Sequence, residues 1–201
     1  AKVCESFGNE NFYYSSSILN CIYDCEYCYL QGVYSSGNIV IFVNLEDMFR
    51  EIEEILKSKS MYICISYDTD LMALEEITGF VKRWYEFVDK HKNLKIELRT
   101  KSASIKVFQN LKPNSNFIIA WTISPKEFAQ KHERGAVSFD MRIKAAKSLI
   151  ESGWNIRVCF DPMIKIENFN QIYGEMVRDT FKEIDSSKVL DVSIGTFRIS
   201  K

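Results

Sequence analysis

The stretch LEDMFREIEEILKSKSMYICIS, residues 45–66, places an amphipathic segment directly before an apolar one. In its first half, apolar side chains recur every three or four positions, which is the spacing of one face of an α-helix. Asn44, just before it, is a candidate N-cap. Residues 62–66 are mostly apolar and are typical of a buried strand. The stretch therefore predicts a helix over 45–56 followed by a strand.

The same alternation continues on both sides of this stretch. Further strand-like runs lie at 13–19, 94–98, 117–121, 156–160 and 189–194. Further helical segments are expected at 71–91, 103–109, 139–152 and 168–184, with Gly153 ending the helix before it. Repeated strand–helix alternation implies right-handed crossovers, so we predict an α/β fold with six parallel strands, mostly apolar on both faces. The periodicity leaves open a doubly wound sheet or one curved toward a barrel, and both place chemistry at the carboxyl ends of the strands.

Composition and charge describe an ordinary globular chain of 201 residues, for which we expect one domain over 1–201, complete or as part of a longer chain. Lys and Arg number 26 against 27 Asp and Glu, so the whole-chain basic excess typical of nucleic-acid binding is missing. The longest apolar runs, 39–43 and 117–121, are far shorter than the roughly 20 residues of a membrane-spanning helix. With no secretory signal visible, we expect a cytoplasmic protein without a membrane segment.

Three cysteines, Cys21, Cys25 and Cys28, fall within eight residues directly after the first predicted strand. Closely spaced thiolates are soft ligands for an iron–sulfur cluster or for zinc. A [4Fe–4S] cluster usually takes four cysteines, so three leave one iron open for chemistry. A structural zinc site would need a second group of ligands, but His91 and His132 stand alone in the sequence. The spacing favours a cluster, with zinc as the alternative.

The CxxxCxxC spacing resembles the signature of the radical S-adenosylmethionine superfamily, and several further segments resemble its spore photoproduct lyase family. These segments are 28–31, 43–47, 67–70, 100–101, 121–124, 132–135, 138–142 and 161–162. The resemblance implies a partial (β/α)6 barrel of parallel strands with outer helices. It also implies a [4Fe–4S] cluster on Cys21, Cys25 and Cys28 that reductively cleaves S-adenosylmethionine to a 5′-deoxyadenosyl radical, which abstracts a substrate hydrogen atom.

Roles for other residues follow from the same resemblance. Tyr27 and Tyr29 match the family tyrosines on either side of the third cysteine, which are implicated in radical transfer and cofactor contact; aromatic packing is the simpler alternative. Polar residues at successive predicted strand ends would bind S-adenosylmethionine, or else are solvated loop residues. They are Thr69, Asp70, Lys101, Thr122, Ser124 and Asp161.

The chain departs from the family pattern at Tyr67. The resemblance places there a cysteine that returns hydrogen to the repaired thymine, so Tyr67 itself becomes a candidate hydrogen donor. Cys64 lies three residues earlier and would not share the face of Tyr67 on a regular strand, so it is expected to be a small buried hydrophobe, as is Cys159. Residues 132–135 are candidates to support the site from behind. Arg142 and Lys144 are expected on a solvated helix face.

Three functions remain open on the sequence. The first is a radical S-adenosylmethionine enzyme of the spore photoproduct lyase type, which repairs thymine dimers and needs a reducing electron donor and DNA or a nucleotide-like substrate. The second is an enzyme of the same family with another substrate, because Tyr67 replaces the donor cysteine. The third is a metal-stabilised nucleic-acid binding module without catalysis. The sequence leaves the oligomeric state open.

Overall fold

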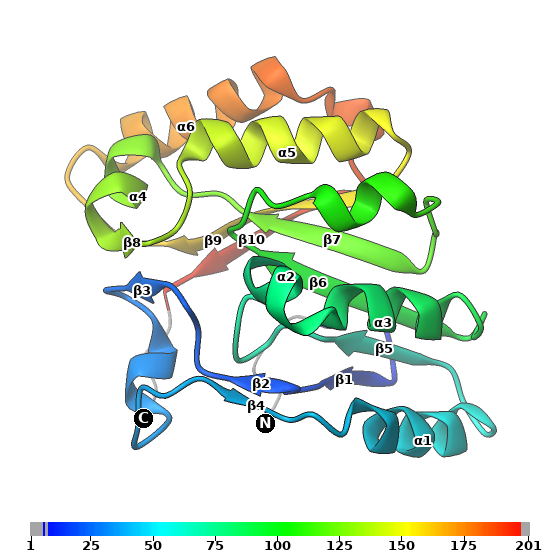
Figure 1. Ribbon diagram of the computed structural model, residues 1–201. Coiled ribbons are helices and arrows are strands. Elements are labelled where there is room, and N and C mark those ends of the chain that lie inside the picture. The colour runs from blue at the N-terminus through cyan, green and yellow to red at the C-terminus, as the bar shows by residue number, and fades with distance from the viewer. Residues whose placement is uncertain (1–5, 7, 198–201) are drawn as a thin grey trace.

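One parallel sheet forms the centre of the fold in a computed structural model that describes residue 6 and residues 8–197 (Figure 1). All neighbouring strands in this six-stranded sheet are parallel. Their spatial order is β1 (Phe12–Tyr14), β5 (Met61–Cys64), β6 (Leu94–Thr100), β7 (Phe117–Thr122), β9 (Asn155–Met163) and β10 (Asp191–Thr196). Spatial order equals chain order, whereas a doubly wound sheet reverses direction at a switch point. The sheet instead curls into a half-barrel with β1 and β10 at its edges, which confirms the predicted α/β partial barrel.

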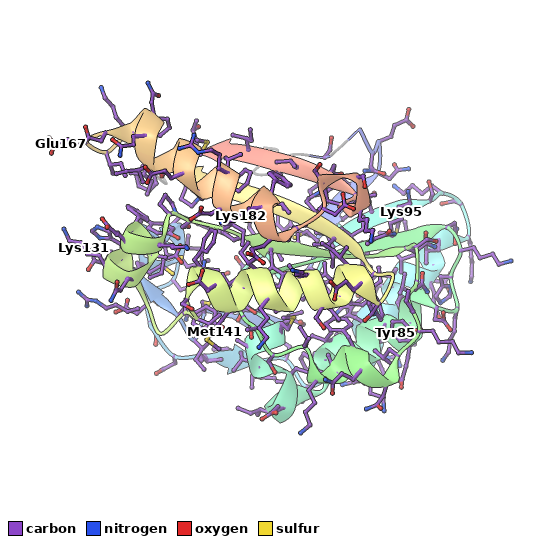
Figure 2. The ribbon with its side chains drawn as sticks, turned by 90° about the horizontal axis from the view of Figure 1, so that it is seen from above. Tyr85, Lys95, Lys131, Met141, Glu167 and Lys182 are labelled. Carbon is purple, nitrogen blue, oxygen red and sulfur yellow. The ribbon has the colours of Figure 1, made fainter. Side chains whose placement is uncertain are left out.

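The helices lie on the outer face of this sheet (Figure 1). They are α1 (Leu45–Leu56), α2 (Glu75–Thr78), α3 (Phe80–Val88), α4 (Lys126–His132), α5 (Phe139–Glu151) and α6 (Phe169–Glu183), with short 3₁₀ turns η1 (Tyr29–Gly32), η2 (Met72–Leu74), η3 (Lys106–Asn110) and η4 (Ser186–Lys188). Figure 2 shows α5 and α6 side by side, and Lys147 pairs with Glu183 between them at 3.4 Å. Within the described residues, no helix is both long and apolar enough to cross a membrane.

Two short antiparallel ladders lie outside the main sheet. One pairs β2 (Ile18–Leu19) with β4 (Val40–Ile41). The other pairs β3 (Asp24–Cys25) with β8 (Glu133–Arg134) and so ties the cysteine loop to the segment before α5.

Local chemistry explains where the helices depart from the expected ones. The segment 71–91 is divided because Gly79 adopts a left-handed conformation with φ of +64°. The carboxylate of Glu75 then accepts the main-chain N–H groups of Val81 and Lys82, at 2.7 and 3.1 Å, and caps α3. Asn44 was expected to cap α1, but its amide donates to Asp47 instead. The segment 103–109, predicted as a helix, forms only the 3₁₀ turn η3. The strand predicted over 13–19 contributes only β1 to the main sheet, and the helix α4 was not predicted.

The end of α5 agrees with the sequence. Gly153 has a φ of +88°, and its N–H donates to the carbonyl of Ile150 at 2.9 Å, as expected for the glycine that follows a helix. At the other end, the Ser138 hydroxyl accepts the N–H of Met141.

The two faces of the strands differ in chemistry. Side chains alternate along a strand, so on β9 Val158 and Phe160 enter the apolar core beneath the helices while Arg157 and Asp161 point to the inner face. Glu97 on β6 is a further buried inner-face charge. The expectation of strands apolar on both faces is therefore wrong for β6 and β9, because the inside of a half-barrel can hold polar groups that pair with one another.

Ion pairs and hydrogen bonds join the inner faces of four strands, β5, β6, β9 and β10. Arg157 pairs with Glu97, donates to the Tyr62 hydroxyl at 2.7 Å, and forms two bonds to Asp191 at 2.5 and 2.7 Å. The Tyr62 hydroxyl donates to Glu97 at 2.5 Å. Replacing such buried pairs with apolar side chains is often neutral or stabilising, so the fold alone does not require them.

Gly195 on β10 makes room for Asp161. A Cβ atom on Gly195 would lie 2.6 Å from Cγ of Asp161 and within 2.8 Å of both carboxylate oxygens. We expect Gly195→Ala to lower the free energy of unfolding by about 1–3 kcal/mol, because this contact forces the strand or the carboxylate to move. Chemical denaturation measures the loss. Gly37→Ala is the matched control, because no atom lies within 4 Å of its Cβ position; equal stability of the two variants would contradict this close contact.

Candidate cluster and cofactor site

A pocket of about 520 Å³ lies at the carboxyl ends of the strands. Its walls come from the cysteine loop, from the ends of β5, β6 and β7, and from Asp161 on β9. A cavity of this size is large enough for a small-molecule ligand. Parallel pairing brings these strand ends to one edge of the sheet, where the sequence had predicted the site.

The cysteine loop is held in place by main-chain geometry. Asn20, just before Cys21, has a φ of +65°, and its side-chain amide donates to the carbonyls of Ser36 and Asn38 at 2.8 and 2.7 Å. Asparagine tolerates this left-handed conformation better than most residues, so it suits the start of the loop. The N–H of Cys28 donates to the carbonyl of Cys25 at 3.0 Å, which closes the second half of the loop.

Cys21, Cys25 and Cys28 all line the pocket. Burial raises the pKa of Cys21 to about 11 and that of Cys25 to about 12, so these thiols need a positively charged partner to become thiolates at neutral pH. In the described part of the chain, no three His, Cys, Asp or Glu side chains are placed to bind one metal ion together.

Most of the predicted residues meet at this pocket. Those that line it besides the cysteines are Tyr27, Tyr29, Tyr67, Thr69, Asp70, Lys101, Thr122 and Asp161. Among the residues that the structure describes, the buried Thr69 hydroxyl has no hydrogen-bond partner, which marks it as a group that a ligand could satisfy. Ser124 does not line the pocket; its hydroxyl donates to Glu133 at 2.7 Å.

Asp70 is bonded within the protein. Its carboxylate accepts the hydroxyl of Thr100 at 2.8 Å and the main-chain N–H groups of Lys101 and Ala73 at 2.7 and 3.0 Å. Burial raises its pKa, although these donors favour the charged form. Asp70 therefore fixes the end of β6 against the loop that follows β5.

Glu133 lies behind the pocket, between the cysteine loop and α5. The hydroxyl of Tyr27 donates to its carboxylate, and Arg142 forms an ion pair with it. Burial alone would raise the pKa of Glu133, but Lys101 and Arg142 outweigh it and the pKa falls below its usual value. The expectation that Arg142 is solvated is wrong: it points inward from α5 and is buried, whereas Lys144 is exposed as expected.

Three tyrosines that line the pocket are linked through Tyr67, which contacts both Tyr29 and Tyr14. The Tyr29 hydroxyl donates to the main-chain carbonyl of Tyr67 at 3.0 Å, and their ring centroids are 5.9 Å apart. Tyr67 stacks on Tyr14 from β1 at 4.4 Å. Burial raises the pKa of Tyr29, so its phenol keeps its proton at neutral pH.

Several lining residues were missed from sequence or given another role. Cys64 is buried as expected, but its inner-face position places it on the pocket wall, whereas Cys159 is buried on the inner face of β9 and does not line the pocket. Arg99 on β6 was not identified; it lines the pocket, pairs with Glu97 at 2.9 Å and contacts Asp161 at 3.3 Å. Period-two alternation along β6 would have placed Glu97 and Arg99 on one face.

The half-barrel and its cysteine loop define the class of fold. The chain superposes with a TM-score of 0.68 and 13% identity on SuiB from Streptococcus suis bound to S-adenosylmethionine, over 95% of this chain and 41% of that one. It superposes with a TM-score of 0.84 and 20% identity on a mutant of spore photoproduct lyase with bound AdoMet and dinucleoside spore photoproduct, over 92% and 56%. The fold is thus that of radical S-adenosylmethionine proteins.

Sequence comparison identifies the family. Residues 13–199 match the family model of spore photoproduct lyase, and the chain belongs to this family. The spore photoproduct lyase of Geobacillus sp. strain Y412MC61 is 22% identical over 183 residues, which are 89% of this chain and 53% of that protein. The chain therefore spans about half the length of this curated relative.

The bonds to Asp70 lead to a test of its structural role. Asp70→Asn would place an amide donor against N–H groups that already donate to this position. We expect a loss of about 1–3 kcal/mol in unfolding free energy, the usual cost of an unsatisfied buried polar group. Urea denaturation measures it. Asp140→Asn is the control, since that carboxylate is 75% exposed; an unchanged stability of Asp70→Asn would contradict the assignment.

Proposed function

We propose that the protein is a radical S-adenosylmethionine enzyme of the spore photoproduct lyase type. The observation that carries the proposal is the meeting of three cysteine thiols, the unpartnered Thr69 hydroxyl and Lys101 at one pocket. Cys21, Cys25 and Cys28 would hold a [4Fe–4S] cluster. With S-adenosylmethionine bound, such a cluster would supply the one electron that cleaves this cofactor to methionine and a 5′-deoxyadenosyl radical. A reducing electron donor and a reducing, cytoplasmic compartment belong to this proposal.

The remaining lining residues would bind and orient the cofactor. Lys101 is 17% exposed and has an ammonium group suited to the cofactor's carboxylate, while Thr69 and Thr122 offer hydroxyl groups. The carboxylate of Asp161 is a further candidate to bind polar groups of the cofactor. Tyr29 is held by its bond to Tyr67, so its ring can contact the cofactor without turning away.

The cysteines provide the first test. We expect anaerobically reconstituted protein to bind iron and sulfide, to show the brown visible absorption of such clusters, and to cleave S-adenosylmethionine to 5′-deoxyadenosine after reduction. Cys21→Ala, Cys25→Ala and Cys28→Ala should each lose cluster and cleavage, because each removes one ligand. Cys159→Ala is the control, since this buried cysteine lies off the pocket. One tightly bound zinc per chain, with no cleavage, would overturn the proposal.

A second candidate keeps the cofactor chemistry but changes the substrate. Tyr67 stands where the family resemblance expects the hydrogen-donor cysteine. The charged residues on the pocket wall also carry more acid than base: Asp68, Asp70, Glu97 and Asp161 against Arg99 and Lys101. Such a lining disfavours a phosphodiester inside the pocket. These two observations favour a substrate other than a dimer in DNA.

Dinucleoside spore photoproduct separates the two candidates, because it presents the lesion without a phosphate. Under the lyase candidate, the reduced enzyme converts it to thymidine, and Tyr67→Phe or Cys64→Ala slows this step by at least about tenfold if that residue returns the hydrogen atom. Under the second candidate, S-adenosylmethionine is cleaved and no thymidine forms. Chromatography of both products, with Tyr13→Phe as the tyrosine control on the outer face of β1, decides between them.

A further inference from the structure

Glu133 joins four separate segments of the chain at one buried carboxylate. Its side chain is 0% exposed. It receives the Tyr27 hydroxyl from the cysteine loop, the Ser124 hydroxyl from the segment after β7, and the Arg142 guanidinium from α5. The ammonium group of Lys101, at the end of β6, lies 4.0 Å from the same carboxylate.

The two cations beside Glu133 are bound differently. Arg142 is bound through all three of its guanidinium nitrogens, because it also donates to the carbonyls of Val137 and Thr122 at 2.9 and 3.2 Å. Lys101 is near enough to be attracted but beyond hydrogen-bond distance, and it faces the pocket. Its N–H groups are therefore not consumed by Glu133, and the ammonium group is held at the pocket wall by charge attraction and by its position over the Tyr27 ring, 5.4 Å from the ring centroid.

The main chain of Glu133 adds a second link. In the β3–β8 ladder Glu133 is the partner of Cys25, and the N–H of Glu26 donates to the carbonyl of His132 at 2.9 Å. The same residue thus contacts the cysteine loop through its backbone and attracts Lys101 through its side chain.

We propose that Glu133 is a positioning residue that sets Lys101 relative to the cysteine loop and leaves the lysine free to bind an anionic group of the cofactor. This inference rests on the proposed function. Without the carboxylate, Lys101 and Arg142 would be two uncompensated cations in a buried space, and Lys101 would move away from Arg142. The Tyr27 and Ser124 hydroxyls donate to the carboxylate oxygen nearest Lys101, and Arg142 pairs with the other oxygen, so both oxygens are occupied and Lys101 does not form a closed salt bridge.

A double-mutant cycle on cofactor binding tests the proposal. In reconstituted protein, Glu133→Gln keeps an acceptor for Tyr27 and Ser124 but removes the charge, and we expect the Kd for S-adenosylmethionine to rise at least about tenfold. In a Lys101→Met background the same change should alter the Kd less than about twofold, because Glu133 acts through Lys101. The Kd for 5′-methylthioadenosine, which has no carboxylate, should change less than about twofold in either background.

Glu26→Gln is the matched control. Glu26 pairs with His132 and Arg134 around the same ladder, but its side chain is 42% exposed and it does not line the pocket. Its Kd values should equal those of the unmodified protein. A Glu133→Gln effect that persists in the Lys101→Met background, or that weakens both ligands equally, would show a purely structural role and overturn the proposal.

A cofactor-free measurement keeps this test separate from the proposed function. Glu133→Gln should lower the unfolding midpoint of the metal-free protein, and adding Lys101→Met should restore part of the loss by removing one of two repelling cations. If the unmodified protein fails to bind S-adenosylmethionine, the proposed function is wrong. If instead the effects of Glu133→Gln and Lys101→Met on the unfolding midpoint are additive, the link between Glu133 and Lys101 is wrong. If Glu133→Gln does not fold, the double variant Glu133→Gln with Arg142→Met replaces it in both measurements. In the double variant the negative charge of Glu133 and the positive charge of Arg142 are removed together, so Lys101 is the one uncompensated charge left at this buried site.

Discussion

Parallel pairing of all six strands is the constraint on which the site depends. Because every strand runs in the same direction, every return connection crosses the outer face and every carboxyl end reaches the same edge. Lys101 and Thr122, at the ends of β6 and β7, therefore face the cysteine loop although they are far from it in sequence. The core beneath the helices supports this edge without contributing to its chemistry.

The sequence predicts this edge well and the inner face poorly. Amphipathic periodicity located α1 correctly to the residue, and β-branched runs located all six strands. The cysteine loop and most strand-end residues could be assigned to one pocket because parallel strands end together. What failed were features that depend on three-dimensional partners. Gly79 divides a helix whose apolar spacing is continuous, since a left-handed glycine leaves no trace in that spacing.

Arg142 shows why charged residues are hard to place from sequence. It occurs on a helix beside exposed residues, where an arginine is usually solvated. Its burial depends on Glu133, nine positions earlier, and on the carbonyls of Val137 and Thr122. Glu97 and Arg157 pose the same problem across strands. Charges of this kind are tolerated inside a protein only when partners from several chain segments pair with them. A single sequence does not show which distant residues will be those partners.

β1 and β10 form the two ends of the sheet, and no ladder joins them in the described chain. A closed barrel has its diameter fixed by strand number and stagger, so it cannot widen without breaking main-chain hydrogen bonds. This sheet is instead open between its edge strands β1 and β10. Phe12 and Tyr14 line the pocket beside β1, and Phe197, directly after β10, lines it beside the other edge strand. Unlike a closed barrel, the sheet therefore has one side of the pocket where a change in width would break no strand-to-strand hydrogen bond of the described residues.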